Sequence, residues 1–215
     1  MKTKAMLAAA VVLFVAAATP VFCLNLNIGA GGGTLLATGK EIDKADPGYS
    51  FKGLFEAEIW NGFSYGVRYS YSNTPAEVVN NFNNDTTVAS YNVNFAHHAF
   101  QLTNTWSPGW RWVDPYIRGA AGINIWEERL GDTLLKAVII NSSTKDTTIN
   151  EVKAASFGIG LGGGISITPF DFLSLRLGVD YDIIFSENKE KFGSEDANEN
   201  LLRVGGELVF RIPIK

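Results

Sequence analysis

The sequence is poor in cysteine and histidine, and it has no long hydrophobic run after its first two dozen residues. Its single cysteine is Cys23, and its two histidines are His97 and His98. A chain with one cysteine forms no internal disulfide, so backbone hydrogen bonds and packing must hold the fold together. A membrane-spanning helix needs an apolar run of about 20 residues, so none is predicted after residue 24.

The sequence also lacks an excess of positive charge. Lys and Arg number 18 against 22 Asp and Glu, a net charge of −4. A basic surface that binds nucleic acid is therefore not expected. The 215 residues suffice for one domain, and 46% hydrophobic with 19% charged residues is the composition of a folded protein.

The N-terminus has the order of a secretory signal peptide. Lys2 and Lys4 precede the apolar run AMLAAAVVLFVAAA (5–18), and Thr19-Pro20 ends it. We expect a signal peptide over 1–23, cleaved after Cys23, and a β-barrel domain over 24–215. The alternative is a lipoprotein with Cys23 as its acylated first residue, which the bulky Phe22 disfavours. Cleavage would leave 16 basic and 22 acidic residues, a net charge of −6.

From Leu24 onward hydrophobic and polar residues alternate, as in β-strands with two different faces. A helical period competes only weakly, at PAEVVNNF (75–82). The segments that alternate, and are predicted as strands, are 24–37, 51–60, 63–72, 93–106, 112–126, 153–168, 172–185 and 200–214.

Short and long connections alternate between these strands. Asn61-Gly62, SPGWR (107–111) and PFD (169–171) are short, and the others are long. In a meander, alternate connections lie at the same end of the sheet. The pattern therefore predicts an all-β fold: an eight-stranded antiparallel up-and-down transmembrane β-barrel with short periplasmic turns and long external loops. Among the long connections, 73–91 reads as a polar loop, and TLLKAVII (133–140) is predicted to add a hairpin beyond the main sheet.

The two faces of the strands differ in chemistry. Over 63–70, Phe63, Tyr65 and Val67 alternate with Ser64 and Arg68. One face of the predicted strands carries hydrophobic residues without a charge, and the other carries six acidic and six basic residues. These charged residues are Lys52, Glu56, Glu58, Arg68, Asp114, Arg118, Arg176, Asp180, Asp182, Arg203, Glu207 and Arg211.

The charged face is expected to line the lumen and the hydrophobic face to contact lipid. A barrel of about eight strands leaves a lumen that side chains only just fill, too narrow for so many large aromatic residues. The alternative is a soluble exported β-sandwich.

Aromatic residues gather near strand ends, as at the two interfaces of a bilayer. The expected girdles are Trp60, Trp106, Trp110, Trp112, Phe170 and Phe172 at the short-turn end, and Tyr49, Phe51, Tyr69, Tyr71, Trp126 and Phe185 at the other.

The inward charges are predicted to pair with one another, because an isolated desolvated charge costs several kcal/mol. An ion-paired, largely closed lumen is the first interpretation, and a narrow channel for ions or small apolar solutes is the second. Porins with open channels use about 16 strands, more than this chain supplies. Gly158, Gly160, Gly162 and Gly164 would face inward and make room for the guanidinium groups of neighbouring strands.

The histidines suggest a third interpretation, an enzyme that modifies lipids in the outer leaflet. Adjacent residues on a strand point to opposite faces, so His97 and His98 cannot hold one metal ion together, and no metal or other cofactor is predicted. Neither histidine has a serine two positions away on its strand, the arrangement of barrel enzymes that act on lipid A. We therefore expect no catalytic residue and no enzymatic activity.

PYIRGAAGINI (115–125) and ITPFDFLSLRLGVDYDI (167–183) resemble strands of the outer-membrane β-barrel superfamily around the outer-membrane protein A and W types. The last strand adds a closer match, because Arg203, Gly205, Leu208 and Phe210 fit the assembly signal of such barrels. The departure from the family pattern is the extension Arg211-Ile212-Pro213-Ile214-Lys215 after it.

The resemblance implies insertion by the barrel-assembly machinery. It also implies a location in the outer membrane, in contact with its lipid and with lipopolysaccharide. We expect a monomer with a structural or interaction role, whose external loops face the environment.

Overall fold

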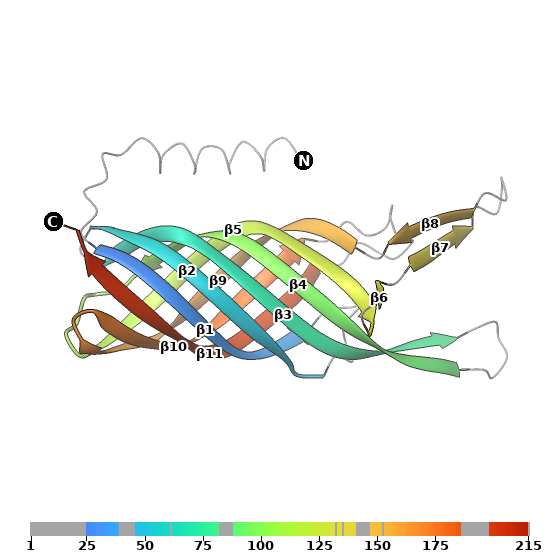
Figure 1. Ribbon diagram of the computed structural model, residues 1–215, viewed down its shortest axis with the longest axis horizontal. Coiled ribbons are helices and arrows are strands. Elements are labelled where there is room, and N and C mark those ends of the chain that lie inside the picture. The colour runs from blue at the N-terminus through green and yellow to red at the C-terminus, as the bar shows by residue number, and fades with distance from the viewer. Residues whose placement is uncertain are drawn as a thin grey trace.

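The computed structural model describes residues 25–38, 46–60, 62–81, 88–131, 133–134, 136–140, 147–151, 153–185 and 198–214. The predicted signal peptide lies outside the described residues. Among those residues no helix is long and apolar enough to cross a bilayer. The strands are β1 (Asn25–Thr38), β2 (Gly48–Trp60), β3 (Phe63–Asn81), β4 (Val88–Trp106), β5 (Val113–Leu130), β6 (Thr133–Leu134), β7 (Lys136–Ile140), β8 (Thr147–Glu151), β9 (Lys153–Phe170), β10 (Leu173–Phe185) and β11 (Asn198–Pro213) (Figure 1).

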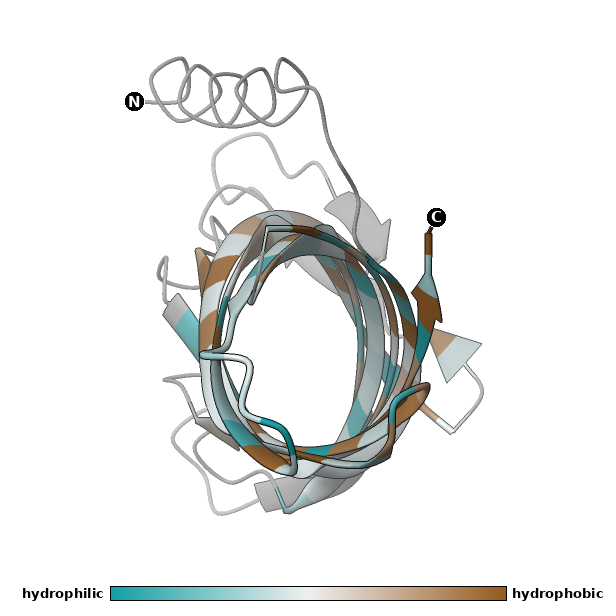
Figure 2. Cartoon of the chain, turned by 90° about the vertical axis from the view of Figure 1, so that its left-hand side faces the viewer, coloured by the Kyte–Doolittle hydropathy of each residue, from teal (hydrophilic) through white to brown (hydrophobic). Residues whose placement is uncertain are grey.

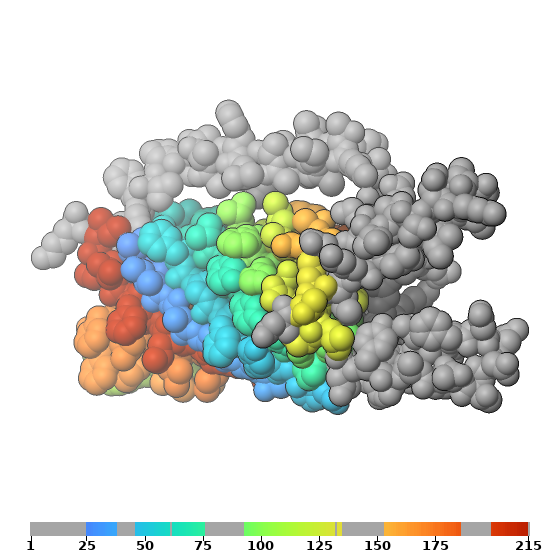
Figure 3. All heavy atoms as spheres, turned by 45° about the vertical axis from the view of Figure 1, so that its right-hand side comes forward, coloured from blue at the N-terminus to red at the C-terminus, as the bar shows by residue number. Residues whose placement is uncertain are grey.

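Eight long strands form a closed antiparallel barrel, which confirms the predicted fold class. Neighbours in the barrel are neighbours in the sequence: the order is β4-β3-β2-β1-β11-β10-β9-β5, and β4 also pairs with β5. The first and last strands meet at a seam that runs from Asn25 opposite Pro213 to Thr38 opposite Asn200. Figure 3 shows this seam from outside, with the blue of β1 against the red of β11.

The closed ladder explains how the wall can lie in a hydrocarbon solvent. Every barrel strand has a hydrogen-bonded neighbour on both sides, so the barrel has no free sheet edge. In lipid no water is available to satisfy exposed N–H and C=O groups, and only helices or closed barrels meet that condition.

Three short turns lie at one end of the barrel, here named the short-turn end. They are at Gly62, at 107–112 and at 171–172. Gly62 has a φ of 83°, and its carbonyl accepts a hydrogen bond from Ser107 N at 2.8 Å. A Cβ at this position would run into the Ser107 carbonyl oxygen, so both the backbone angle and the close approach require glycine.

The opposite end, the long-loop end, differs from the sequence prediction. Most of 73–91 was expected to be a polar loop with a weak helical period, and this expectation is wrong. β3 and β4 continue as a paired ribbon from Asn73 opposite Ala96 to Asn81 opposite Val88, and Figure 1 shows it extending beyond the barrel. Each strand offers the other a backbone ladder, which outweighs the low strand propensity of Asn.

The segment around 133–140 carries the predicted extra hairpin. β7 pairs with β8 from Lys136 opposite Glu151 to Ile140 opposite Thr147, in a sheet separate from the barrel. The barrel strand β5 also runs further than predicted, to Leu130, where it pairs with β6.

The outer face of the barrel is hydrophobic, and hydrophobic and hydrophilic residues alternate along the strands (Figure 2). Trp60, Trp110 and Trp112 are exposed at the short-turn end, and Phe51 and Phe185 at the other. Trp126 is an exception to the predicted girdle, because its side chain is only 4% exposed. It lies an even number of residues from Arg118 on β5, so both side chains are on the same face of the strand and point into the lumen.

The outer face predicts how a charge would be tolerated there. Leu161, halfway along β9, is 69% exposed. In a bilayer, Leu161→Arg should cost about 2–4 kcal/mol of unfolding free energy, because the guanidinium would lie at mid-membrane depth. The matched control Ile214→Arg, beyond the end of β11, should cost about 1 kcal/mol or less. Urea titration of the barrel in lipid vesicles measures both; equal, small costs would mean that the face contacts water.

Candidate functional site: the barrel lumen

A cluster of two acids and two arginines lies in the half of the lumen nearer the short turns. Arg118 Nη2 is 2.6 Å from Glu207 Oε1, and Arg176 Nη1 is 3.0 Å from Glu56 Oε2. Each arginine also lies within 4.0 Å of the other acid, so the four charges form a closed square. Thr105 Oγ1 donates a further hydrogen bond of 2.6 Å to Glu56. These residues come from five different strands, so the cluster ties the wall together across the lumen.

A second cluster lies further toward the long-loop end. Asp182 pairs with Arg203 and, at 3.3 Å, with Arg68, and it accepts a hydrogen bond of 3.0 Å from Gln101 Nε2. Asp180 pairs with Arg68 Nη1 at 3.0 Å. Each carboxylate is therefore held by at least two donors.

Lys52 joins the two clusters. Its Nζ is 3.1 Å from Asp180 and 3.2 Å from Glu207. This reach depends on a glycine, because Gly31 lies directly between Lys52 and Glu207 on the neighbouring strands. A Cβ at Gly31 would run into Glu207 Cα and Cβ.

The network is buried as deeply as the core of a soluble protein. Glu56 and Asp182 are 0% exposed and Arg118 is 1% exposed. At this depth a charge without a partner would cost several kcal/mol, whereas a fully paired set is tolerated. The network joins nine of the predicted charges, namely Lys52, Glu56, Arg68, Arg118, Arg176, Asp180, Asp182, Arg203 and Glu207.

The glycine stripe of β9 makes room for this network, though not in the way the sequence suggested. Gly158, Gly160, Gly162 and Gly164 face inward, but a Cβ at Gly160 or Gly162 would meet the Asp182 or the Asp180 carboxylate. The groups accommodated here are thus acids rather than guanidinium groups, because both aspartates lie on the adjacent strand opposite these glycines.

Glu58, Asp114 and Arg211 lie apart from the network. Glu58 accepts a hydrogen bond of 2.6 Å from Asn25 Nδ2. Among the described residues neither Asp114 nor Arg211 has an ion-pair partner. All three line a cavity of about 290 Å³ between the network and the short turns.

Several uncharged lumen residues were not singled out from the sequence. The Tyr116 ring centre lies 5.4 Å from the Arg118 guanidinium and 5.6 Å from that of Arg176, so the ring supports both arginines. Thr105 and Gln101 bond carboxylates of the network, as described above. Their inward parity on the strands was the signal that could have identified them.

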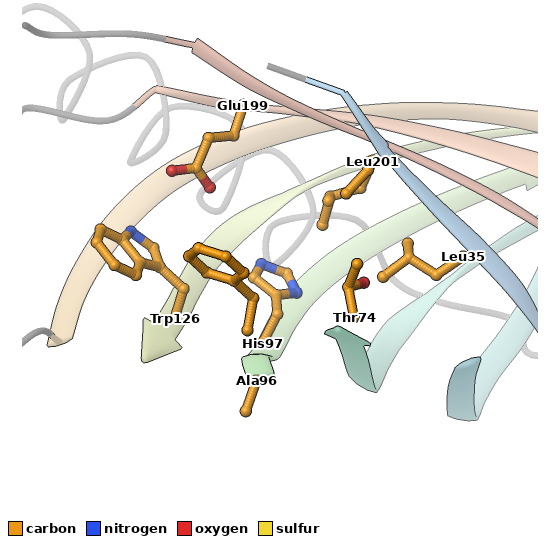
Figure 4. Close-up of a pocket in the computed structure, with 9 residues that line it drawn as sticks. Leu35, Thr74, Ala96, His97, Trp126, Glu199 and Leu201 are labelled. Carbon is orange, nitrogen blue, oxygen red and sulfur yellow. The ribbon is translucent and has the colours of Figure 1, made fainter. Parts of the chain in front are cut away.

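A small hydrophobic cluster of Leu35, Ile184 and Leu201 is buried in the lumen toward the long loops. Beside it lies a small cavity lined by Leu35 and Leu201 together with Trp126, His97, Thr74 and Glu199 (Figure 4). The cavity between them measures about 20 Å³, room for about one water molecule. Buried side chains thus lie in the lumen at two successive levels.

The histidines point to opposite faces, as predicted. His97 is buried, and its Nδ1 lies 3.5 Å from Arg203 Nη2. His98 faces outward, and its Nδ1 lies 2.9 Å from the Tyr69 hydroxyl. Among the described residues no three His, Cys, Asp or Glu side chains are arranged to hold a metal ion.

The predicted assembly signal lies on β11. Leu208 and Phe210 are exposed on the outer face, while Arg203 points into the lumen. Gly205 pairs with Gly33 of β1 at the seam. The hydrophobic positions of the signal are therefore on the surface of the strand that closes the barrel.

A hydrophobic outside around an ion-paired inside defines a small β-barrel of the outer-membrane type. Comparison with solved structures finds the same fold in Neisserial surface protein A, with a TM-score of 0.57 and 14% identity over 88% of this chain and 97% of that one. The outer membrane protein OprG from Pseudomonas aeruginosa gives a TM-score of 0.50 and 10% identity, over 89% of this chain and 97% of that one. These matches confirm the suspected resemblance at the level of the fold.

Sequence comparison adds no closer relation. No family model matches the chain, and no curated protein matches it in sequence.

The network predicts that replacing a buried arginine lowers the unfolding free energy much more than replacing an exposed one. Arg118→Gln leaves Glu207 and Glu56 with fewer donors in a dry lumen, and should lower the unfolding free energy by about 3–5 kcal/mol. The control is Arg129→Gln, whose side chain is 42% exposed and pairs with Glu127 at 2.5 Å. That change should cost about 1 kcal/mol or less. Denaturant unfolding in lipid vesicles compares them, and a similar cost for both would show that the lumen is wet and weakly coupled.

Proposed function

We propose that this protein is an integral, monomeric barrel of a Gram-negative-type outer membrane with a structural or interaction role and a closed lumen. The observation that carries the proposal is the burial of the network: Glu56, Asp182 and Arg118 have at most 1% of their surface accessible. A cross-section whose central charges are buried and bonded to each other supports a lumen that is closed to water and ions. The hydrophobic layer around Leu35 and Leu201 supports the same conclusion at a second level.

A closed lumen would leave the two ends of the barrel as the places where function resides. The β3–β4 ribbon and the β7–β8 hairpin extend the fold at the long-loop end. We infer that this end faces the outside of the cell, because short turns lie on the periplasmic side of such barrels. Its surroundings would then be lipopolysaccharide and external partners.

The proposed route to the membrane uses both ends of the sequence. The segment 1–23 would direct export and be removed. The exposed Leu208 and Phe210 of the last strand would then be recognised by the barrel-assembly machinery. The family resemblance of β11 and its place at the seam support this proposal.

We propose a non-enzymatic role without a cofactor. A lipid-modifying enzyme would need His97 or His98 beside a nucleophile or an acid. Among the described residues, the side-chain hydrogen-bond contact of His97 is the Arg203 guanidinium and that of His98 is the Tyr69 hydroxyl on the outer face, and neither ring contacts a serine or a carboxylate at that distance.

The test of closure is single-channel recording of the 24–215 chain in planar bilayers. The expected result is no current steps, because the network seals the lumen. Flotation of the same preparation with lipid vesicles is the control that the protein has inserted. Uniform current steps from inserted protein would contradict closure and favour the narrow channel.

A further inference from the structure

A cavity lies in the lumen at the short-turn end of the barrel. It measures about 290 Å³, near the lower end of the range for ligand pockets. Arg176, Thr105 and Tyr116, residues of the ion-pair network or in contact with it, form its inner end. Mostly polar side chains from the ends of the strands line the rest, so the cavity is a polar pocket at this end of the barrel.

Two buried acceptors in this pocket have no hydrogen-bond partner among the described residues. They are Asn27 Oδ1 on β1 and Asp114 Oδ1 on β5. Asn27 is 2% exposed and Asp114 is 8% exposed, and both side chains line the cavity. Both oxygens have almost no accessible surface of their own, and a buried acceptor without a donor costs about 1–3 kcal/mol, so this part of the wall has an excess of acceptors.

A positive group completes the pocket. Arg211 on β11 lines the same cavity, forms no ion pair with a described residue, and leaves its Nε without a hydrogen-bond partner. In the barrel, β9 and β10 separate β11 from the strand of Asp114. The acid and the base therefore face the same space from separate parts of the wall without neutralising each other.

We propose that this pocket binds a small zwitterion whose ammonium and carboxylate groups are several bonds apart. The ammonium would pair with the Asp114 carboxylate, which lines the cavity and has no ion-pair partner among the described residues. The carboxylate would accept the fork of Arg211, the geometry that suits a guanidinium. A simple anion would satisfy Arg211 but not Asp114, and a simple cation Asp114 but not Arg211, whereas a zwitterion satisfies both. This site is independent of whether the lumen is closed.

The test is a titration of the folded barrel in detergent micelles with diglycine, followed by NMR chemical shifts. Its two charged ends are further apart than those of a single amino acid, as the separation of β5 and β11 requires. Diglycine should bind at least about tenfold more tightly than acetate or methylammonium alone, since each of these fills half of the site. Equal or weaker binding of diglycine would overturn the proposal.

Variants assign the binding to the named residues. Asp114→Asn and Arg211→Gln should each weaken diglycine binding by about tenfold or more, and Arg211→Lys, which keeps the charge without the fork, by less. The control Asp171→Asn changes an exposed acid at the rim of the same cavity and should leave binding within about twofold. Unfolding curves like that of the unchanged chain show that each variant is folded. Binding that is insensitive to Asp114 and Arg211, or equally sensitive to Asp171, would contradict the site.

Discussion

The closed hydrogen-bond ladder of the wall is the constraint on which the rest of the structure depends. In hydrocarbon an unpaired backbone group is too costly, so each strand must have two neighbours and the last must meet the first. The seam between β1 and β11 is therefore a continuous pairing from Asn25 opposite Pro213 to Thr38 opposite Asn200. Once the wall is closed, successive side chains on a strand point alternately to lipid and to the lumen, so each side chain contacts one or the other.

The small circumference then determines the chemistry of the lumen. Eight strands enclose a space that side chains nearly fill, so the most deeply buried charges must be paired. Arginine suits this position because one guanidinium can satisfy two carboxylates, as Arg118 and Arg176 do with Glu56 and Glu207. Gly31, Gly160 and Gly162 have no side chain, and this leaves the space that the acids of the network occupy.

Much of this arrangement was predictable, because alternation is a property of the sequence. The alternation along each strand placed Arg68, Arg118 and Asp182 on the inward face. The short turns showed which connections share one end of the barrel. Partners were not predictable, since alternation gives the face of a residue but not its height across the barrel. Asp114 and Arg211 lie on the same inward face as the network, yet they lie nearer the short turns, and neither forms an ion pair with a described residue.

Two other differences between the sequence prediction and the structure lie toward the long-loop end. The Asn-rich ribbon of β3 and β4 has too little hydrophobic alternation to be recognised as strand, although each of its two strands pairs with the other along its length. Trp126 was assigned to a girdle by its residue type, whereas its parity places it inside. In both cases the backbone geometry decided the outcome and composition misled.

The measurement that bears most directly on this orientation is the folding of the 24–215 chain with and without a bilayer, followed by circular dichroism. A hydrophobic outer wall predicts β-structure and cooperative unfolding in lipid vesicles or detergent, and aggregation when urea is diluted into buffer alone. A soluble, folded, monodisperse protein in buffer would contradict it, because the hydrophobic face would then have to be on the inside.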